Sequence, residues 1–402
     1  MIQCPAAQLF TLSYWAMRWL YWLAVFTVTA VAGERQLTTS ARNHALDNND
    51  NFSADDRFLC VDTRGTGWAI LRVNVATGAE SVVYEAGPQV VAASYSPVAD
   101  EIIFIHGPFD RPYAKTDRLG AVVPAGGGTA RFLDVRDVVS EVTPAGAHRG
   151  GTHRHEYSLD GKRVAFTYDD HLLPAYGRTI GMLVPRPGNW FFVNLVPVAP
   201  EAEAKAGDIV MAAGDSWVGS KGTMRAFIGK VKEADGTLRS SLFVLDIPAD
   251  LDVTTAYAGD RKTYPKPPRG VKIRRLTKGE AYGIARGSRD GKWIAYLADA
   301  ADGTRQVFVV PSAGGAAKQV TAVEGGVAGA VRWHPSGRYV AAATRRGIVA
   351  AEVATGKTRF LTEKAGDALV WSNNGKLLAF NRKVGEHLQV FLVDFDVAGS
   401  GF

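Results

Sequence analysis

Downstream of residue 32, hydrophobic residues come in short runs, and the same small polar cluster precedes most of these runs. The cluster is an aromatic residue or Gly, then Ser, a variable residue, Asp or Asn, and Gly, with substitutions in some copies. Copies begin at Phe52, Tyr95, Tyr157, Gly287, Trp333 and Trp371, with a weaker copy at Trp217. The runs are rich in β-branched and aromatic residues, which is typical of β-strands. We expect strands at Phe58–Asp62, Ile102–His106, Val164–Tyr168, Ala226–Gly229, Trp293–Leu297, Tyr339–Ala343 and Leu377–Asn381.

Each polar cluster suits a tight turn, because Gly adopts a positive φ and the Ser or Asp side chain bonds nearby backbone amides. A single small sheet cannot bury both of its faces, whereas sheets arranged radially cover one another. We therefore predict an all-β protein, a β-propeller with seven blades, or with six if the segment from Trp217 is not a blade. No long stretch after Ala32 has the period and caps of a helix.

The ends of several repeats predict how the ring of blades closes. A basic residue, a variable residue, Leu or Val, and Thr end three of the repeats, at Arg274–Thr277, Lys318–Thr321 and Arg359–Thr362. The last repeat, from Trp371, has no such ending, but the pattern stands near the N-terminus as Arg35–Thr38. We predict that this N-terminal strand joins the final blade and removes the open edge of the sheet.

Two segments are longer than the repeat requires, Pro108–Thr152 and Gly177–Ala213, and we expect long loops there. A basic run from Lys266 to Arg275 is expected to be a solvated linker between blades, with contact to an acidic polymer as the alternative.

Composition excludes several classes of protein. The chain has 46 Lys and Arg against 40 Asp and Glu, a net charge of +6 that permits acidic ligands without indicating nucleic acid. Two cysteines cannot build a disulfide framework or a Cys-rich zinc site. No Gly-x-Ser-x-Gly motif is present, so nothing supports an α/β-hydrolase.

The N-terminus reads as an export signal, residues 1–32. Arg18 precedes an apolar stretch, Trp19–Val31, and Ala30 and Ala32 supply the small residues of a cleavage site. An uncleaved membrane anchor is the alternative, and Met17 is a candidate for the true start. We expect a periplasmic or secreted protein whose remaining residues, 33–402, form a single propeller domain without a stable membrane span.

The repeated clusters, the Leu-Thr strand ends and the export signal together resemble the TolB-like propellers of bacterial envelopes. The segments Gly150–Ser158, Phe166–His171 and Asn43–His44 look like an uncharacterised bacterial family known as Tol biopolymer-transport-related. The pair His153 and His155 before a Ser-x-Asp-Gly turn is also similar to oligogalacturonate lyase. That resemblance implies a divalent metal held by three His and one Gln, and cleavage of oligouronides by β-elimination. The family's Gln falls on Gly150 here.

The two histidines of this pair are candidate metal ligands. Residues two apart on a regular strand point to the same side, so His153 and His155 are expected to face the central channel together. His148, in the preceding Gly-flanked segment, is the third candidate ligand. A divalent metal, Mn, Zn or Ca, would fit such a set of nitrogen and oxygen ligands. The alternative is that these histidines are structural.

Aligning the repeats on the turn Ser suggests a polar patch on one side of the channel. Asp50 and Asp215 occupy the position that matches His155, and Asn48 the position that matches His153. Arg154 lies between the two histidines. These four residues, Asn48, Asp50, Arg154 and Asp215, are candidate substrate-binding groups.

If the protein is an enzyme, its residues suit β-elimination on a uronate. Such a reaction needs a base to remove the proton beside the carboxylate, and a cation to stabilise the charge that develops. Tyr168 and His171 are candidate acids or bases, and Arg149 and Arg178 are candidate carboxylate clamps. We expect a monomer that binds an acidic oligosaccharide and cleaves it as a metal-dependent lyase. The alternative is a non-catalytic platform that binds an envelope protein.

Overall fold

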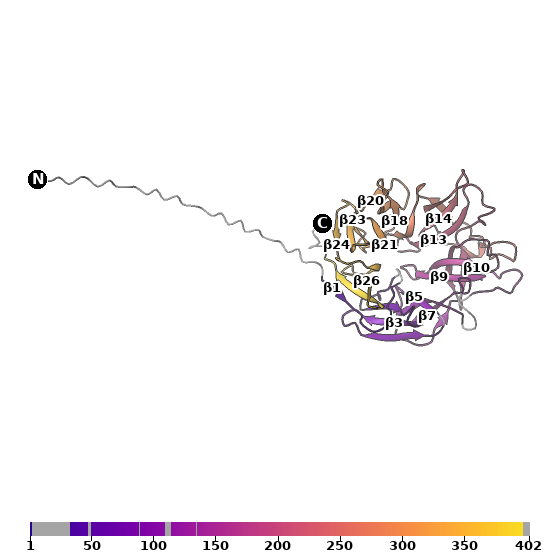
Figure 1. Cartoon of the computed structure of the whole chain (residues 1–402). Coiled ribbons are helices and arrows are strands. Elements are labelled where there is room, and N and C mark those ends of the chain that lie inside the picture. Colours follow the sequence, from indigo (N-terminus) through magenta and orange to yellow (C-terminus); the bar gives the residue numbers. More distant parts are fainter. Residues whose placement is uncertain (2–32, 47–49, 88, 109–113, 134, 397–402) are drawn as a thin grey trace. The chain divides into compact units, whose positions relative to one another are not determined.

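The computed structural model describes Met1 and residues 33–46, 50–87, 89–108, 114–133 and 135–396. The expected export signal, residues 2–32, and the candidate residue Asn48 lie outside the described residues. Residues 31–402 belong to one compact unit. In this unit the described strands form seven small antiparallel sheets arranged around a centre, so the seven-bladed all-β propeller is confirmed (Figure 1).

The blades follow one another along the chain, and in blades 2 to 6 the first strand lies nearest the centre, as β5, β9, β13 and β21 do in Figure 1. Blades 1 to 3 contain β2 (Phe58–Asp62), β3 (Ala69–Asn74), β4 (Glu80–Glu85); β5 (Val90–Tyr95), β6 (Glu101–His106), β7 (Leu119–Pro124), β8 (Arg131–Phe132); and β9 (Gly150–Tyr157), β10 (Val164–Asp170), β11 (Thr179–Arg186), β12 (Asn189–Asn194). In blade 1 the segment before β2 takes the inner position, through bridges from Ala45 to Asp62 and from Phe52 to Leu59.

Blades 4 to 7 repeat the pattern. They contain β13 (Ile209–Trp217), β14 (Met224–Lys232), β15 (Leu238–Asp246), β16 (Lys272–Arg275); β17 (Tyr282–Gly287), β18 (Trp293–Asp299), β19 (Arg305–Pro311), β20 (Lys318–Gln319); β21 (Val327–Trp333), β22 (Tyr339–Thr344), β23 (Ile348–Glu352), β24 (Thr358–Phe360); and β25 (Asp367–Trp371), β26 (Leu377–Val384), β27 (His387–Asp394) with β1 (Glu34–Gln36). The weak repeat at Trp217 is therefore a complete blade, which decides between six and seven. The described residues contain one short 3-10 helix, Val253–Thr255, and no helix long and apolar enough to span a membrane.

The polar clusters form the predicted turns between the inner strand and the second strand. In blade 3, Ser158 Oγ donates to Asp160 Oδ1 at 2.6 Å and accepts from Arg163 N at 3.1 Å. The same bonds recur at Ser53, Ser288 and Ser372. Because every blade has the same strand order, these turns lie on one face of the ring of blades, which we call the turn face. The inner strands begin on the opposite face.

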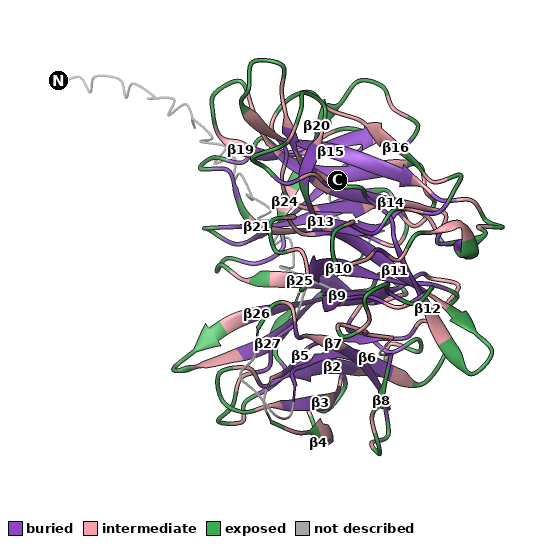
Figure 2. Ribbon diagram, turned by 90° about the vertical axis from the view of Figure 1, so that its right-hand side faces the viewer, coloured by how far each residue is buried: buried purple, intermediate pink, exposed green. Residues whose placement is uncertain are grey.

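Burial follows the strands. Figure 2 shows buried residues along the sheets and exposed residues in the loops and hairpin ends. Indole N–H groups of inner-strand tryptophans tie neighbouring blades together. Trp217 Nε1 donates to Glu156 O at 3.0 Å, and Trp333 Nε1 donates to Arg286 O at 2.8 Å. Each of these bonds satisfies a buried carbonyl on the preceding blade.

The N-terminal strand closes the ring as predicted. β1 pairs antiparallel with β27, with Arg35 opposite Leu392, and becomes the outer strand of blade 7. The Thr38 hydroxyl accepts from Val390 N at 2.9 Å, as Thr321 does from Val307 N and Thr362 from Ile348 N. The matching Leu-Thr endings therefore predicted a real structural equivalence.

Two expectations about loops are wrong. The segments at residues 108–152 and 177–213 contain β7 and β8, and β11 and β12, because these strands are ordinary parts of blades 2 and 3. The basic run is also not a linker, since Lys272–Arg275 forms β16, where Arg274 pairs with Asp246 at 2.6 Å. The long connection instead lies between β15 and β16.

Replacing Thr38 with Val should destabilise the closed ring. The Thr38 hydroxyl is buried and also donates to Gln389 Oε1 at 2.7 Å, so the variant leaves two buried polar groups without this partner. We expect a loss of about 1–3 kcal/mol in the free energy of unfolding, measured by chemical denaturation. The exposed neighbour Thr39 provides the control, and Thr39→Val should change little. Equal stability of the two variants would contradict the role of this hydroxyl.

Candidate functional site

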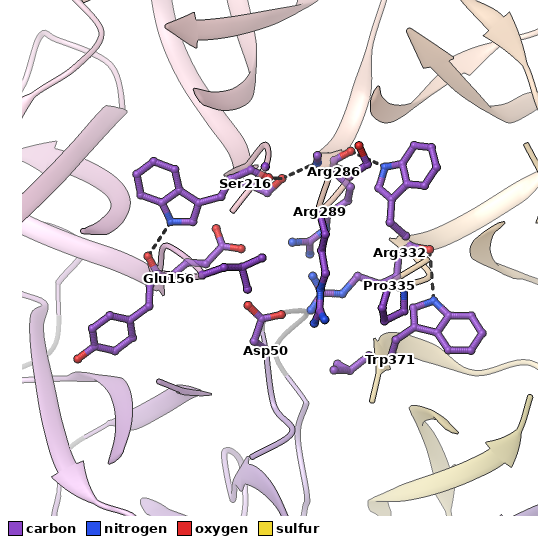
Figure 3. A pocket seen from close by; sticks show the side chains of 16 residues that line it. Asp50, Glu156, Ser216, Arg286, Arg289, Arg332, Pro335 and Trp371 are labelled. Atoms are coloured by element: carbon purple, nitrogen blue, oxygen red, sulfur yellow. Dashed lines mark hydrogen bonds between the residues drawn. The ribbon is translucent and has the colours of Figure 1, made fainter. Parts of the chain in front are cut away.

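A polar pocket lies at the centre of the ring, on the turn face (Figure 3). Six of the seven blades contribute to it, all except blade 2. Its lining residues are Asp50, Glu156, Tyr157, Leu159, Ser216, Trp217, Gly219, Arg286, Gly287, Ser288, Arg289, Arg332, Trp333, Pro335, Val370 and Trp371. Most of these residues are inner-strand ends or turn residues, so the convergence of inner strands on the axis creates the pocket.

Arginine side chains dominate the charge of this pocket. Arg286 and Arg332 are buried and Arg289 is half-buried, and all three lie on blades 5 and 6. Burial lowers the pKa of Arg286 well below its usual value, and the neighbouring guanidinium groups of Arg332 and Arg154 lower it further. Asp50 and Glu156 oppose this shift. The centre of the ring therefore gathers four guanidinium groups around two carboxylates.

Contacts between blades hold these groups in place. Arg332 Nε donates to Leu369 O at 2.9 Å on blade 7, and Arg289 Nη2 donates to Asn373 Oδ1 at 2.9 Å. Across the pocket, Glu156 Oε2 accepts from Arg225 Nη1 at 2.8 Å. Neighbouring blades thus hold the Glu156 carboxylate and the guanidinium groups of Arg289 and Arg332 in place, so this part of the pocket is preorganised.

Three tryptophans form aromatic walls of the pocket, Trp217, Trp333 and Trp371. Trp217 and Trp333 donate their indole N–H groups to the preceding blade as described above, and Trp371 Nε1 donates to Arg332 O at 3.4 Å (Figure 3). Since each N–H group already has an acceptor, these side chains offer the pocket aromatic surface rather than a further hydrogen-bond donor.

The expectation that His153 and His155 face the channel side by side is wrong. In β9, His153 pairs with Thr167 and Glu156 with Ala165, so Arg154 and His155 together oppose the single residue Phe166. This is a β-bulge, and Arg154 has the positive φ of 57° that accompanies it. His155 packs on Phe166 with ring centroids 5.2 Å apart, whereas His153 is paired with Thr167 on the other face of the strand pair. The bulge therefore separates the two imidazoles.

The side chains of His155 and His148 are buried among residues of blade 3 and of the neighbouring blade 2. His155 is 1% exposed, its Nε2 lies 2.9 Å from Thr152 Oγ1, and its imidazole lies against Gly120 of blade 2. His148 packs edge-on against Tyr168 and Phe192. Among the described residues, no three His, Cys, Asp or Glu side chains lie together as a metal site requires. The candidate ligands His148, His153 and His155 thus do not form a shared coordination sphere.

Arg149 and Tyr168 belong to a buried polar network at the other end of β9 and β10. Arg149 Nη2 donates to Asp170 Oδ2 at 2.9 Å, and Tyr168 Oη donates to the same oxygen at 2.9 Å. Arg149 also donates to Thr263 O, on the long connection between β15 and β16. Burial raises the pKa of Tyr168 well above its usual value, and Asp170 adds to this shift. The network fastens the long connection to blade 3.

His171 and Arg178 lie close to this network, on the face opposite the pocket. His171 is exposed, with Nδ1 3.4 Å from Thr116 Oγ1, and Arg178 pairs with Asp169 at 2.9 Å. The structure therefore does not bring the four predicted catalytic residues to the central pocket, and their catalytic roles stay predictions.

The four predicted substrate-binding residues have three different outcomes. Asp50 lines the pocket, and Arg154 interacts electrostatically with its arginines. Asp215 is buried in an ion pair with Arg225, whose guanidinium also lies over the Trp217 ring at 4.8 Å. Asn48 lies outside the described residues.

Sequence reasoning missed the arginines on blades 5 and 6 because it followed the position three residues before the turn Ser. The bulge buries the side chain at this position between blades, and Ala285 of blade 5 and Val331 of blade 6 are buried there. The position one residue later supplies Glu156, Ser216, Arg286, Arg332 and Val370, all of which line the pocket. Comparing this second column across the repeats would have revealed the site.

The chain is similar to several known proteins. A family described as "Protein of unknown function (DUF3748)" matches residues 89–186. The uncharacterised protein YidR of Escherichia coli (strain K12) is 32% identical over 397 residues, covering 86% of this chain and 94% of YidR. Oligogalacturonate lyase in complex with manganese is a similar structure, with TM-score 0.60 and 10% identity over 92% of this chain and 94% of that one. A protein of Agrobacterium tumefaciens described as TolB has TM-score 0.44 and 16% identity over 81% of this chain and 97% of that one.

His155→Ala should destabilise the protein, because the imidazole fills space between blades 2 and 3. An added Cβ on Gly120 would lie 2.7 Å from His155 Nε2, so little else fits there. We expect a loss of about 2 kcal/mol in the free energy of unfolding, measured with urea. His171→Ala, at an exposed position, is the control and should change it by less than about 0.5 kcal/mol. A His155→Ala variant as stable as the control would contradict this packing role.

Stability should fall on acidification because three histidines are kept neutral in the folded state. Burial lowers the pKa of His148 and of His155 to about 3, and burial with nearby Arg118 and Arg178 lowers that of His153 to about 2. The unfolded chain binds protons at these sites below about pH 6.5. Each histidine therefore removes about 1.4 kcal/mol per pH unit as the pH falls from there toward 4.

Chemical denaturation at a series of pH values measures this loss. In His155→Ala the slope below pH 6.5 should correspond to about one proton fewer than in the unchanged protein. An unchanged slope would show that His155 binds its proton equally in both states.

Proposed function

The chain belongs to the family of YidR, and from this premise we propose that its propeller binds an acidic oligosaccharide of the uronate class in the central pocket. The family name leaves the activity open, so the proposal depends on the pocket itself. The observation that carries it is the group of Arg286, Arg289 and Arg332 beside aromatic walls, at the point where the inner strands converge.

Guanidinium groups suit the carboxylates of uronic acids. Arginine offers planar pairs of donors that match a carboxylate, and a buried setting strengthens the attraction. Burial and neighbouring guanidinium groups already lower the pKa of Arg286 and Arg332. An entering carboxylate would relieve this repulsion among the cations, which favours an acidic ligand over a neutral one.

The remaining lining residues suit the rest of a sugar. Asp50, Glu156 and Ser216 provide acceptors for sugar hydroxyl groups. The tryptophan walls provide apolar surface for the C–H faces of the ring. Similarity in fold to oligogalacturonate lyase supports the same ligand class, because that protein's name states that it acts on an oligouronide.

We assign binding and no cleavage step to this pocket. The manganese of the similar structure has no counterpart here in the described histidines, since the β9 bulge separates His153 from His155 and His148 packs among aromatic rings. β-Elimination would also need a base at the bound sugar, and Tyr168 donates to Asp170 inside a buried network. We further propose that the protein acts in the periplasm or outside the cell, as the sequence of residues 1–32 indicates.

Calorimetric titration of the full chain with oligogalacturonate tests the proposal. We expect binding that weakens as salt is added, and no binding of a neutral galactose oligomer. Arg289→Gln and Arg332→Gln should each weaken binding by about 10- to 100-fold, because each removes a charged hydrogen-bond donor. Arg338→Gln is the control, since Arg338 is exposed, lies outside the pocket and pairs with Glu352.

Arg289 is half-buried, so its replacement keeps the test valid if Arg332→Gln fails to fold. Unchanged affinity in a folded Arg289→Gln variant, or equal binding of the neutral oligomer, would overturn the proposal. Ultraviolet absorbance of unsaturated uronate product, followed in the same samples, separates a lyase from a binding protein.

A further inference from the structure

We propose that a second, basic groove at the opposite mouth of the ring binds further units of the same acidic chain, which makes the protein selective for oligomers over single sugars. This inference rests on the function proposed above and extends it to a site that lies away from the turn face.

The groove runs over blades 5, 6 and 7 and reaches the inner segment of blade 1 at Ala45 and Leu46. One part is bordered by Tyr282–Ile284 and Val327–Val331, and the other by Ala365–Ala368 and Asn381–Lys383. Both parts share Ala328, Gly329, Arg345 and Asp367 as lining residues, so they adjoin. The segments named are the starts of inner strands and the ends of second strands, which places the groove opposite the turn face.

One residue is shared by this groove and the central pocket. Arg286 lines the pocket on the turn face and also lines the part of the groove beside blade 5. The two cavities therefore share Arg286 as a lining residue. A carboxylate bound near Arg286 would lie beside both cavities, and we place the junction between successive acidic units of the ligand there.

Charge at the groove favours an acidic occupant. Its basic lining residues are Arg64, Arg286, Arg305, Arg345, Arg382 and Lys383, and its acidic lining residue is Asp367. Several of these cations already have acidic partners, as Arg305 has in Asp299 at 3.1 Å. Arg345 and Lys383 are exposed and form no ion pair with another residue in the described part of the chain. These two are the side chains most available to a ligand.

The groove is rigid enough to act as a binding surface. Asp367 Oδ1 accepts from Ala330 N at 2.9 Å, which joins the inner strands of blades 6 and 7. Tyr282 is fixed at the edge by the Arg305 guanidinium, 3.5 Å from its ring centroid, and by a 3.1 Å bond from its hydroxyl to Asp299. An added Cβ at Gly329 would lie 2.6 Å from Asp367 Oδ1, so a side chain there would have to displace the carboxylate that holds Ala330.

The length dependence of binding tests the groove. Calorimetric titration with galacturonate monomer, dimer, trimer and hexamer should give affinity that rises with length for the unchanged protein. In the Arg345→Gln, Lys383→Gln double variant the hexamer should bind about fivefold more weakly, while the affinity for the monomer stays the same. Arg346→Gln is the matched control, because Arg346 is the adjacent exposed arginine and does not line the groove.

The outcomes separate the two proposals. Binding of all lengths with equal affinity, or a hexamer affinity that the double variant leaves unchanged, overturns the groove and leaves the central pocket intact. Loss of monomer binding in the double variant contradicts the division into two subsites. An unchanged protein that binds none of these uronates overturns both proposals, whereas a length effect lost in the double variant and kept in Arg346→Gln supports the groove.

Discussion

Each blade of this protein can bury its two faces only against its neighbours, and every other feature depends on that contact being continuous around the ring. A three- or four-stranded sheet alone would leave both of its faces in water. Strand β1 supplies the outer strand that blade 7 lacks, and Thr38 bonds there as the matching threonines do in other blades. Closure of the ring thus comes from residues more than 350 positions apart in sequence.

The same contact explains the buried polar groups along the inner strands. Indole N–H groups of Trp217 and Trp333 bond to backbone carbonyls of the preceding blade. Arg225 bridges Asp215 on its own blade and Glu156 on the blade before it. Because each of these groups has its partner across a blade boundary, they specify how neighbouring blades dock as well as adding to stability. Asp215, a candidate substrate-binding residue, is therefore held in its ion pair with Arg225 by the fold itself.

The bulge of the inner strands decides which side chains reach the axis. Similar register shifts occur in blades 2 to 7, as between Val91 and Ser94 or between Asp367 and Val370. After the bulge, the position of His155 turns between blades, and the next position faces the pocket. The arginines on blades 5 and 6 and Glu156 on blade 3 thereby meet at the centre. Gathering like charges in a poorly solvated place is unfavourable alone, and it creates an environment that an anion would stabilise.

The sequence alone determined the all-β class, the repeated turns and the closing strand, because turn chemistry and strand propensity are local and the copies reinforce one another. It did not determine the faces of His153 and His155, since a single extra residue in β9 reverses alternation and no residue type marks it. It also could not place Arg286, Arg289 and Arg332 together with Glu156, which lies more than 120 residues earlier in the chain. Only the tertiary structure places these four side chains in one pocket, because radial packing brings the inner strands of distant repeats to one axis.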